Sequence, residues 1–324
     1  MRNLNLEAAI WSLFASSDFF LEAARECDNT SEWFGNLAIS RKSVNLGRNN
    51  QVFDALKTFA RDFNRGAELA KFGDYQLVWD TARSVRGDIR GMMEQPLQSW
   101  MSAAEYKEFS DCRVGRILTY ARQISTVLHN AMVGAKYFCD AGVNWSDRNN
   151  DDDGFPGDEI VASYEECAKS YPNSLIWKLP SILPECYIDT STACQTGDEV
   201  PLTGIWYPKT GLERHSLTFA IKGMRMQPVF RITKTREELE VEGVAFPYPE
   251  TIAVATIWHP VIASVPRLGT TQELWAKAGQ PCPKAGVWQP TDPGAAQRTY
   301  QEGEPMLDLK SAYGFTVWRW MADR

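Results

Sequence analysis

The sequence Pro201-Leu202-Thr203-Gly204-Ile205-Trp206-Tyr207-Pro208 returns 82 residues later as Pro283-Lys284-Ala285-Gly286-Val287-Trp288-Gln289-Pro290. Both copies follow the pattern P-x-x-G-[IV]-W-x-P. Glycine before β-branched and aromatic residues predicts a tight turn into a strand, and the final proline predicts the end of strand pairing. We therefore expect two short strands, each with its tryptophan on the buried face.

The similarity continues beyond the two octapeptides. Gly223-Met224-Arg225-Met226 and then Thr256-Ile257-Trp258 follow the first copy, whereas Gly303-Glu304-Pro305-Met306 and then Thr316-Val317-Trp318 follow the second. The same elements in the same order predict an internal duplication, with units at about 198–260 and 279–324. The residues expected to define the two units are Gly204, Trp206, Pro208 and Trp258 in the first and Gly286, Trp288, Pro290 and Trp318 in the second.

The rest of the C-terminal part, residues 198–324, also favours a β-rich domain. Apolar and polar residues alternate with period two in 215–221 and 252–258, and the run 315–320 has the composition of a strand. Two helical capping boxes interrupt these strands. One begins at Thr235 and the other at Thr270, and the second predicts a short helix over 272–278.

Residues 1–142 have a different period. Apolar residues recur at helical spacing in four segments, at about 6–24, 52–70, 77–93 and 114–135. Each amphipathic helix needs another to cover its apolar stripe, so these segments predict a bundle. The fold class we expect is α+β, with an N-terminal helical bundle followed by a mostly β C-terminal domain built from two Trp-centred repeat units.

Residues 143–197 read as an acidic connection that contains Pro, Gly and a short helix. A twelve-residue calcium loop laid on Asn149 places Ile160 at position 12, where a bidentate Glu is needed, so we predict no metal site. The acidic residues are either a solvated linker or a contact surface for a basic partner. They are Asp151, Asp152, Asp153, Asp158 and Glu159.

Composition excludes several classes of protein. The 324 residues include 34 Lys+Arg and 41 Asp+Glu, a net charge of −7, which disfavours a nucleic-acid binder. The sequence shows neither a secretory signal pattern nor a long apolar run, so we expect a cytoplasmic protein without a membrane partner. The seven scattered cysteines predict reduced thiols rather than disulfides or zinc ligands.

Catalytic chemistry finds little support. The chain holds 12 Trp but only three His, and it lacks the common nucleophile, phosphate-loop, dinucleotide and zinc-protease motifs. We therefore predict a binding protein without a cofactor rather than an enzyme. Two alternatives stay open: a carboxylate-based enzyme site between the domains, and a small-ligand or glycan module that uses exposed tryptophans.

Motifs in the last 125 or so residues resemble the C-terminal region of bacterial polymorphic-toxin immunity proteins of the immunity protein 71 and 72 type. They are Arg267-Leu268-Gly269, the segment 282–288, Gly303-Glu304-Pro305-Met306 and the segment 316–320. Leu307 departs from the pattern, in which we expect Pro after Met306. In that family, too, a helical region precedes the Trp-, Gly- and Pro-rich part.

The resemblance implies an immunity protein for a toxin delivered by an apparatus such as the type VI secretion system. Such a protein has no active site and binds one toxin domain tightly, so that it occludes or distorts the toxin's active site. If the toxin is basic, acidic side chains accelerate association by electrostatic steering. The acidic cluster at 151–159 is then the first candidate for the toxin contact.

Overall fold

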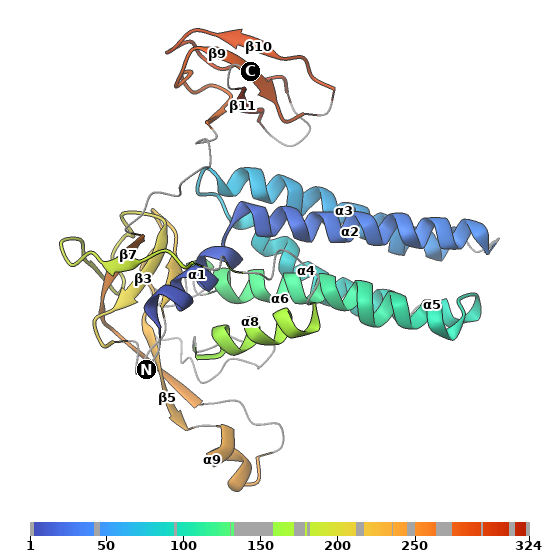
Figure 1. Cartoon of the computed structure of the whole chain (residues 1–324), viewed down its shortest axis with the longest axis horizontal. Coiled ribbons are helices and arrows are strands. Elements are labelled where there is room, and N and C mark those ends of the chain that lie inside the picture. Colours follow the sequence, from blue (N-terminus) through green and yellow to red (C-terminus); the bar gives the residue numbers. More distant parts are fainter. Residues whose placement is uncertain are drawn as a thin grey trace. The chain divides into compact units, whose positions relative to one another are not determined.

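The computed structural model describes residues 3–41, 46–93, 96–129, 131–132, 158–171, 179, 182–211, 217–234, 236–244, 250–263, 274–292, 294–310 and 315–321. Helices form the N-terminal half and antiparallel sheets the C-terminal region, so the predicted α+β class is confirmed (Figure 1). The chain divides into two compact units, Met1–Ser264 and Val265–Arg324. We call them the first and second units.

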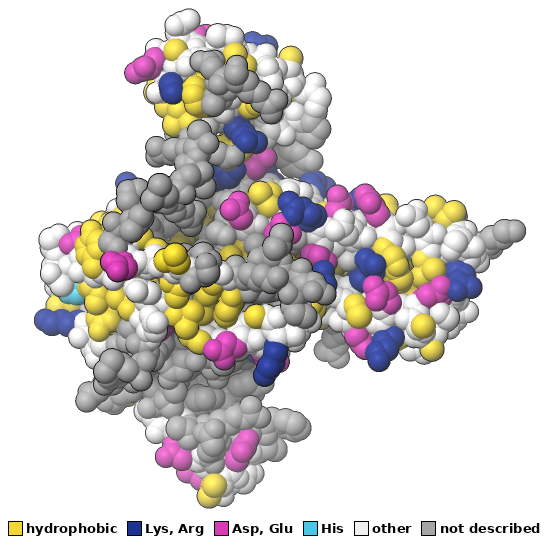
Figure 2. Space-filling model, in the orientation of Figure 1, with side chains coloured by type: hydrophobic (Ala, Val, Ile, Leu, Met, Phe, Trp, Pro, Cys, Tyr) yellow, Lys and Arg dark blue, Asp and Glu magenta, His cyan; other side chains and the backbone are white. Residues whose placement is uncertain are grey.

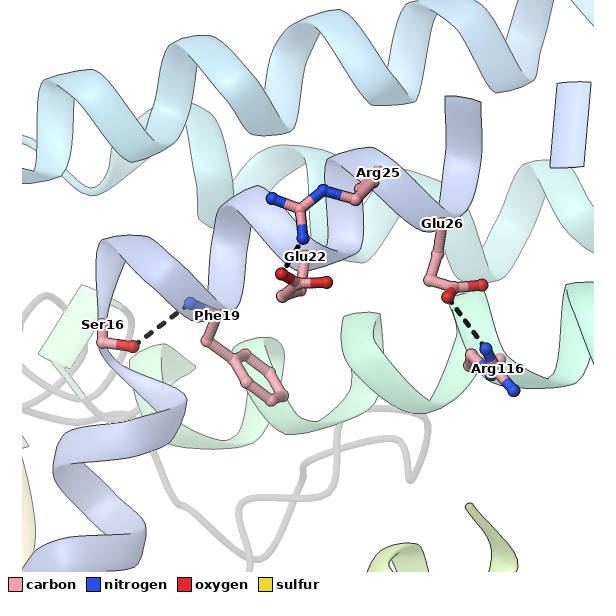
Figure 3. Close-up of polar contacts among 6 residues, drawn as sticks. All are labelled: Ser16, Phe19, Glu22, Arg25, Glu26 and Arg116. Atoms are coloured by element: carbon pink, nitrogen blue, oxygen red, sulfur yellow. Dashed lines mark hydrogen bonds and ion pairs between the residues drawn. The ribbon is translucent and has the colours of Figure 1, made fainter. Parts of the chain in front are cut away.

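Helices account for most of the described part of the first unit before residue 171. They are α1 (Leu4–Phe14), α2 (Ser17–Ser40), α3 (Leu46–Ala70), α4 (Gln76–Met93), a 3₁₀ turn (Leu97–Ser99), α5 (Ala103–Lys107), a π-helical segment (Glu108–Val114), α6 (Gly115–His129) and α8 (Asp158–Ser170). The apolar stripe at 6–24 is divided between two helices because Ser16 caps α2. Its Oγ accepts a hydrogen bond from Phe19 N at 3.2 Å (Figure 3).

The helices bury a core rich in phenylalanine. Helices α2 and α3 lie side by side, as Figure 1 shows, and α4 and α6 pack against each other. The ring centroids of Phe19 and Tyr120 lie 4.9 Å apart. At Gly66 of α3, an added Cβ would come within 2.8 Å of Val78 Cβ, so glycine there allows α3 and α4 to approach closely.

The first unit also contains two sheets. The first sheet comprises β1 (Cys186–Ile188), β2 (Cys194–Gln195), β3 (Gly204–Pro208), β4 (Thr218–Ala220) and β7 (Ile257–Ala263), in the order β1-β7-β3-β4 with β2 also paired to β7. A separate ribbon pairs β5 (Val229–Lys234) with β6 (Glu250–Val254), and α9 (Arg236–Val241) follows β5. The predicted strand at 252–258 is thus divided between β6 and β7.

The second unit is one four-stranded antiparallel sheet, which we call the second sheet. Its strands are β8 (Trp275–Lys277), β9 (Gly286–Pro290), β10 (Arg298–Tyr300) and β11 (Val317–Met321), in the order β10-β9-β11-β8. The helix predicted over 272–278 is therefore wrong for the described residues 274–278. Ala276 pairs with Trp318 and is 2% exposed, so strand pairing and core burial override the capping signal there.

The two sheets share strand order and register. The order β2-β7-β3-β4 in the first sheet corresponds to β8-β11-β9-β10 in the second. Pro208 lies opposite Trp258, as Pro290 lies opposite Trp318. Equivalent backbone hydrogen bonds also recur in the loops: Gly197 N donates to Met226 O and Gly279 N donates to Met306 O, both at 2.8 Å.

The centres of the two sheets are built from equivalent residues. Trp206 and Trp258 fill the first with Met226, and Trp288 and Trp318 fill the second with Met306. The indole N–H of Trp258 donates to Gln227 O, and that of Trp318 donates to Leu307 O, both at 2.9 Å. Each sheet therefore covers a small core, and the same indole-to-carbonyl hydrogen bond lies at the edge of both cores.

The compact units divide at residue 264, not at the expected boundary between 197 and 198. The first sheet belongs with the helices because long-range polar contacts join it to α1. Glu7 Oε1 accepts a hydrogen bond from Leu217 N at 3.0 Å, and Asn5 Oδ1 accepts one from Cys186 N at 2.9 Å. Most of the predicted connection 143–178 lies outside the described residues.

Candidate interaction surface

The acidic residues singled out in the sequence lie only partly within the described chain. Asp151, Asp152 and Asp153 lie outside it, whereas Asp158 and Glu159 are the first two residues of α8. Carboxylates in the first turn of a helix are favoured by the partial positive charge of the helix N-terminus.

The described residues offer no arrangement typical of a metal site. They contain no group of three or more His, Cys, Asp or Glu side chains that could hold a metal ion. Ile160, at position 12 of the calcium loop considered above, is 3% exposed and belongs to the helical core. Burial raises the pKa of the Cys194 thiol to about 11, so this cysteine stays protonated at neutral pH.

Several carboxylates on the helices are paired with cations. Figure 3 shows Glu22 beside Arg25 and Glu26 beside Arg116. The Glu26–Arg116 pair joins α2 to α6 at 2.9 Å. On the face drawn in Figure 2, basic and acidic side chains alternate over the helices rather than gathering by sign. This mixture is typical of a solvated helical surface rather than a single-sign contact patch.

The carboxyl groups with shifted pKa values do not suit general acid catalysis. The hydrogen bond from Arg41, together with one from Ser102 N, lowers the pKa of the half-buried Glu105 to about 2. Hydrogen bonds from Ser191 likewise lower the pKa of Asp189. A general acid at neutral pH needs a pKa shifted in the opposite direction.

The four tryptophans that define the two repeat units are core residues. Trp206, Trp288 and Trp318 are fully buried, and Trp258 is 2% exposed. A glycan-binding module would need several of five tryptophans to face solvent, namely Trp206, Trp258, Trp288, Trp318 and Trp320, and the first four present no ring face to it. The fifth, Trp320, is half-buried beneath Lys284, whose Nζ lies 3.8 Å from the ring centroid.

The faces opposite these tryptophans differ between the two sheets. In the first sheet, Ile205 lies opposite Phe219, and both are buried in the helical core. Phe219 packs edge-on against Tyr75, with ring centroids 5.2 Å apart. The corresponding pair in the second sheet is Val287 and Thr299, of which Val287 is half-buried and Thr299 is exposed.

Three rows of side chains make up this face of the second sheet, which we call the outer face. Arg319 is exposed, and its Cζ lies 5.8 Å from the ring centroid of Trp275. The four strands β8 to β11 contain three cationic residues and no Asp or Glu. The pairing register places the following residues on the outer face: Lys277 and the fully buried Val317 in one row, Trp275, Arg319 and Gln289 in the next, and Met321, Val287 and Thr299 in the third. Arg298 lies opposite Trp288 on the other face.

The outer face is not predicted by the sequence patterns above, although the sequence contains a signal for it. Positions occupied by Ile205 and Phe219 in the first unit hold Val287 and Thr299 in the second, and Tyr207 is replaced by Gln289. Comparing the two copies position by position identifies a face whose residues are apolar in the first unit and a mixture of polar and apolar in the second. The strand pairing was needed to show that these positions lie on one face.

Comparison with protein-family models, with curated proteins and with solved structures gives no match. Among the described residues, none of the helices is both long enough and apolar enough to cross a membrane.

Proposed function

We propose that this chain is an immunity protein that binds a cognate antibacterial toxin domain in the cytoplasm and blocks its active site. The observation that carries the proposal is the outer face of the second sheet. This face combines Trp275, Arg319 and Met321 on a rigid sheet whose opposite side is closed by buried tryptophans. Tryptophan and arginine are the side chains most often responsible for binding energy in protein interfaces, and methionine is enriched there as well.

The resemblance of the C-terminal motifs to immunity proteins of the 71 and 72 type supports the same function. A toxin delivered by contact, for example through a type VI secretion system, also enters sibling cells, which need an inhibitor that acts without turnover. Tight binding of a preformed surface meets this need, because a rigid sheet loses little conformational entropy on association. No cofactor is required for such inhibition.

Co-expression tests the proposal directly. The toxin candidate is the variable C-terminal domain of a large secreted protein encoded next to this chain. We expect that domain to stop growth of a bacterial host when produced alone, and we expect co-production of this chain to restore growth. Purified chain and a catalytically inactive toxin domain should then elute as one complex. Growth arrest that persists with folded, abundant chain would refute the proposed function.

The acidic cluster is a second proposed contact within this function. We expect Asp151, Asp152 and Asp153 to speed the encounter with a basic toxin domain by steering. Reversing all three charges should then lower the association rate at low salt while leaving the dissociation rate nearly unchanged. An unchanged association rate would remove the cluster from the interface and leave the outer face as the candidate contact.

A further inference from the structure

We propose that the outer face of the second sheet receives an amphipathic helix of the toxin domain, which carries a carboxylate toward the β10 edge. This inference rests on the proposed function and names the surface and the chemistry of its partner. It follows from the way in which helices of the first unit cover the corresponding face of the first sheet.

The first unit provides the template for the bound helix. The face of the first sheet that corresponds to the outer face packs against the helices, and α1 contacts β3. Helix α1 contributes Glu7, which is 1% exposed and accepts the backbone hydrogen bond from Leu217 N at 3.0 Å. Leu217 directly precedes the edge strand β4. A helix with one carboxylate can thus cover the apolar face of this type of sheet and also accept a hydrogen bond from the backbone beside its edge strand.

The register identifies the equivalent edge in the second sheet. Trp206 lies opposite Thr218 in the first sheet, and Trp288 lies opposite Arg298 in the second. Gln297, which directly precedes β10, therefore corresponds to Leu217, and it is exposed. A carboxylate on a helix docked in the same way would reach the backbone N–H of Gln297.

The residues on the outer face suit a partner that binds reversibly. Where the first unit has Leu217, Phe219 and Ile221, the second has Gln297, Thr299 and Gln301, all exposed. A face covered permanently within one chain needs apolar residues, whereas a face that is exposed before binding needs polar ones to stay soluble. The mixed composition therefore fits a reversible protein partner better than a permanent intramolecular one.

Charge selects an acidic helix as the occupant. The strands place two cations, Lys277 and Arg319, and no acidic residue on the outer face, so carboxylates on the partner meet a complementary potential. Nucleic acid is a poorer match, because the chain as a whole has a net charge of −7 and the two cations on the outer face neutralise few phosphates.

The test compares charge reversals on the two faces of the same sheet. Arg319→Glu changes the outer face, and Thr299→Glu adds a negative charge to the same face on the edge strand. Arg298→Glu is the matched control, because Arg298 is exposed but lies opposite Trp288 on the other face. The probe is the catalytically inactive toxin domain, and the full-length chain is used throughout. Amide hydrogen exchange of β9 and β11 verifies that each variant keeps its fold.

We expect each of the two outer-face variants to raise the Kd for the toxin domain about tenfold or more, and the control to leave the Kd within about twofold. A photocrosslinker at position 299 should label a helical segment of the toxin domain, whereas one at position 298 should not. Binding unchanged by both outer-face variants would overturn this inference alone. A wild-type chain that does not bind the toxin domain would overturn the proposed function as well.

Two other occupants of the outer face, a second copy of the chain and a nucleic acid, would each give a distinct result. If light scattering shows a dimer of the chain without toxin that Arg319→Glu dissociates, the face joins two copies and the inference is wrong. If Arg319→Glu abolishes binding to single-stranded RNA while toxin binding is unaffected, the partner is a nucleic acid and the inference is again wrong.

Discussion

Alanine at Gly286 should destabilise the second unit, whereas alanine at the equivalent Gly204 should leave the first unit almost unchanged. Gly286 has φ +141°, a backbone conformation that residues with a Cβ rarely adopt. An added Cβ would also lie 2.6 Å from Nε1 of Trp320, so the indole has to move. At Gly204 the φ angle is unexceptional and the nearest atom, Leu202 Cδ1, is 3.7 Å away.

The expected loss of stability in Gly286→Ala has two sources, backbone strain and the contact with Trp320. Backbone strain of this kind costs about 1–3 kcal/mol. Overpacking against a half-buried indole adds roughly 1–3 kcal/mol. The second unit has about 60 residues, and at roughly 0.05–0.15 kcal/mol per residue its whole stability is about 3–9 kcal/mol. Gly286→Ala therefore removes a large part of that stability, while Gly204→Ala should cost less than about 1 kcal/mol.

The assay must resolve the two units, because a chain with two units does not unfold in one step. Hydrogen exchange followed by mass spectrometry reports the opening free energy of β9 to β11 separately from that of α2 and α6. In Gly286→Ala we expect faster exchange in the second sheet only. The reasoning is refuted if Gly286→Ala exchanges like the wild type to within about 0.5 kcal/mol, or if Gly204→Ala is equally damaging.

Three further predictions concern single contacts. Glu7→Leu leaves the N–H of Leu217 buried without its acceptor and should destabilise the first unit by about 1–3 kcal/mol in urea unfolding, whereas Glu7→Gln, which keeps an acceptor oxygen, should cost less. The pKa of Glu105 is lowered to about 2, so its contribution to stability is present above its ordinary value of 4.5 and is lost as the pH falls toward 2. Arg41→Ala should raise that pKa toward 4.5 in an NMR titration and remove this part of the acid dependence; a pKa that stays near 2 would contradict the assignment. Trp318→Phe removes the indole donor to its backbone acceptor and should cost about 1 kcal/mol or more, and the faster hydrogen exchange should be confined to the second unit; equal loss of protection in α2 would count against separate units.

The sequence alone located the short strands at the centre of each sheet. The two octapeptides predicted strands that the structure places at Gly204–Pro208 and Gly286–Pro290. It also predicted that Trp206 and Trp288 are buried, which both are. These predictions succeeded because turn-forming glycine, β-branched residues and a terminal proline act locally, over fewer than ten residues. Helical periodicity located the bundle for the same reason.

Only the tertiary structure decided which face of each sheet is covered. The contact between Glu7 and Leu217 joins residues 210 positions apart, and no local pattern predicts such a contact. With it, burial of Ile205, Phe219 and Ile221 in the helical core holds the first sheet within the unit that ends at residue 264. In the second sheet, pairing of Ala276 with Trp318 overrides a helix signal, because burial against a distant strand outweighs a capping preference. The outer face likewise exists only once four separate strands are in register.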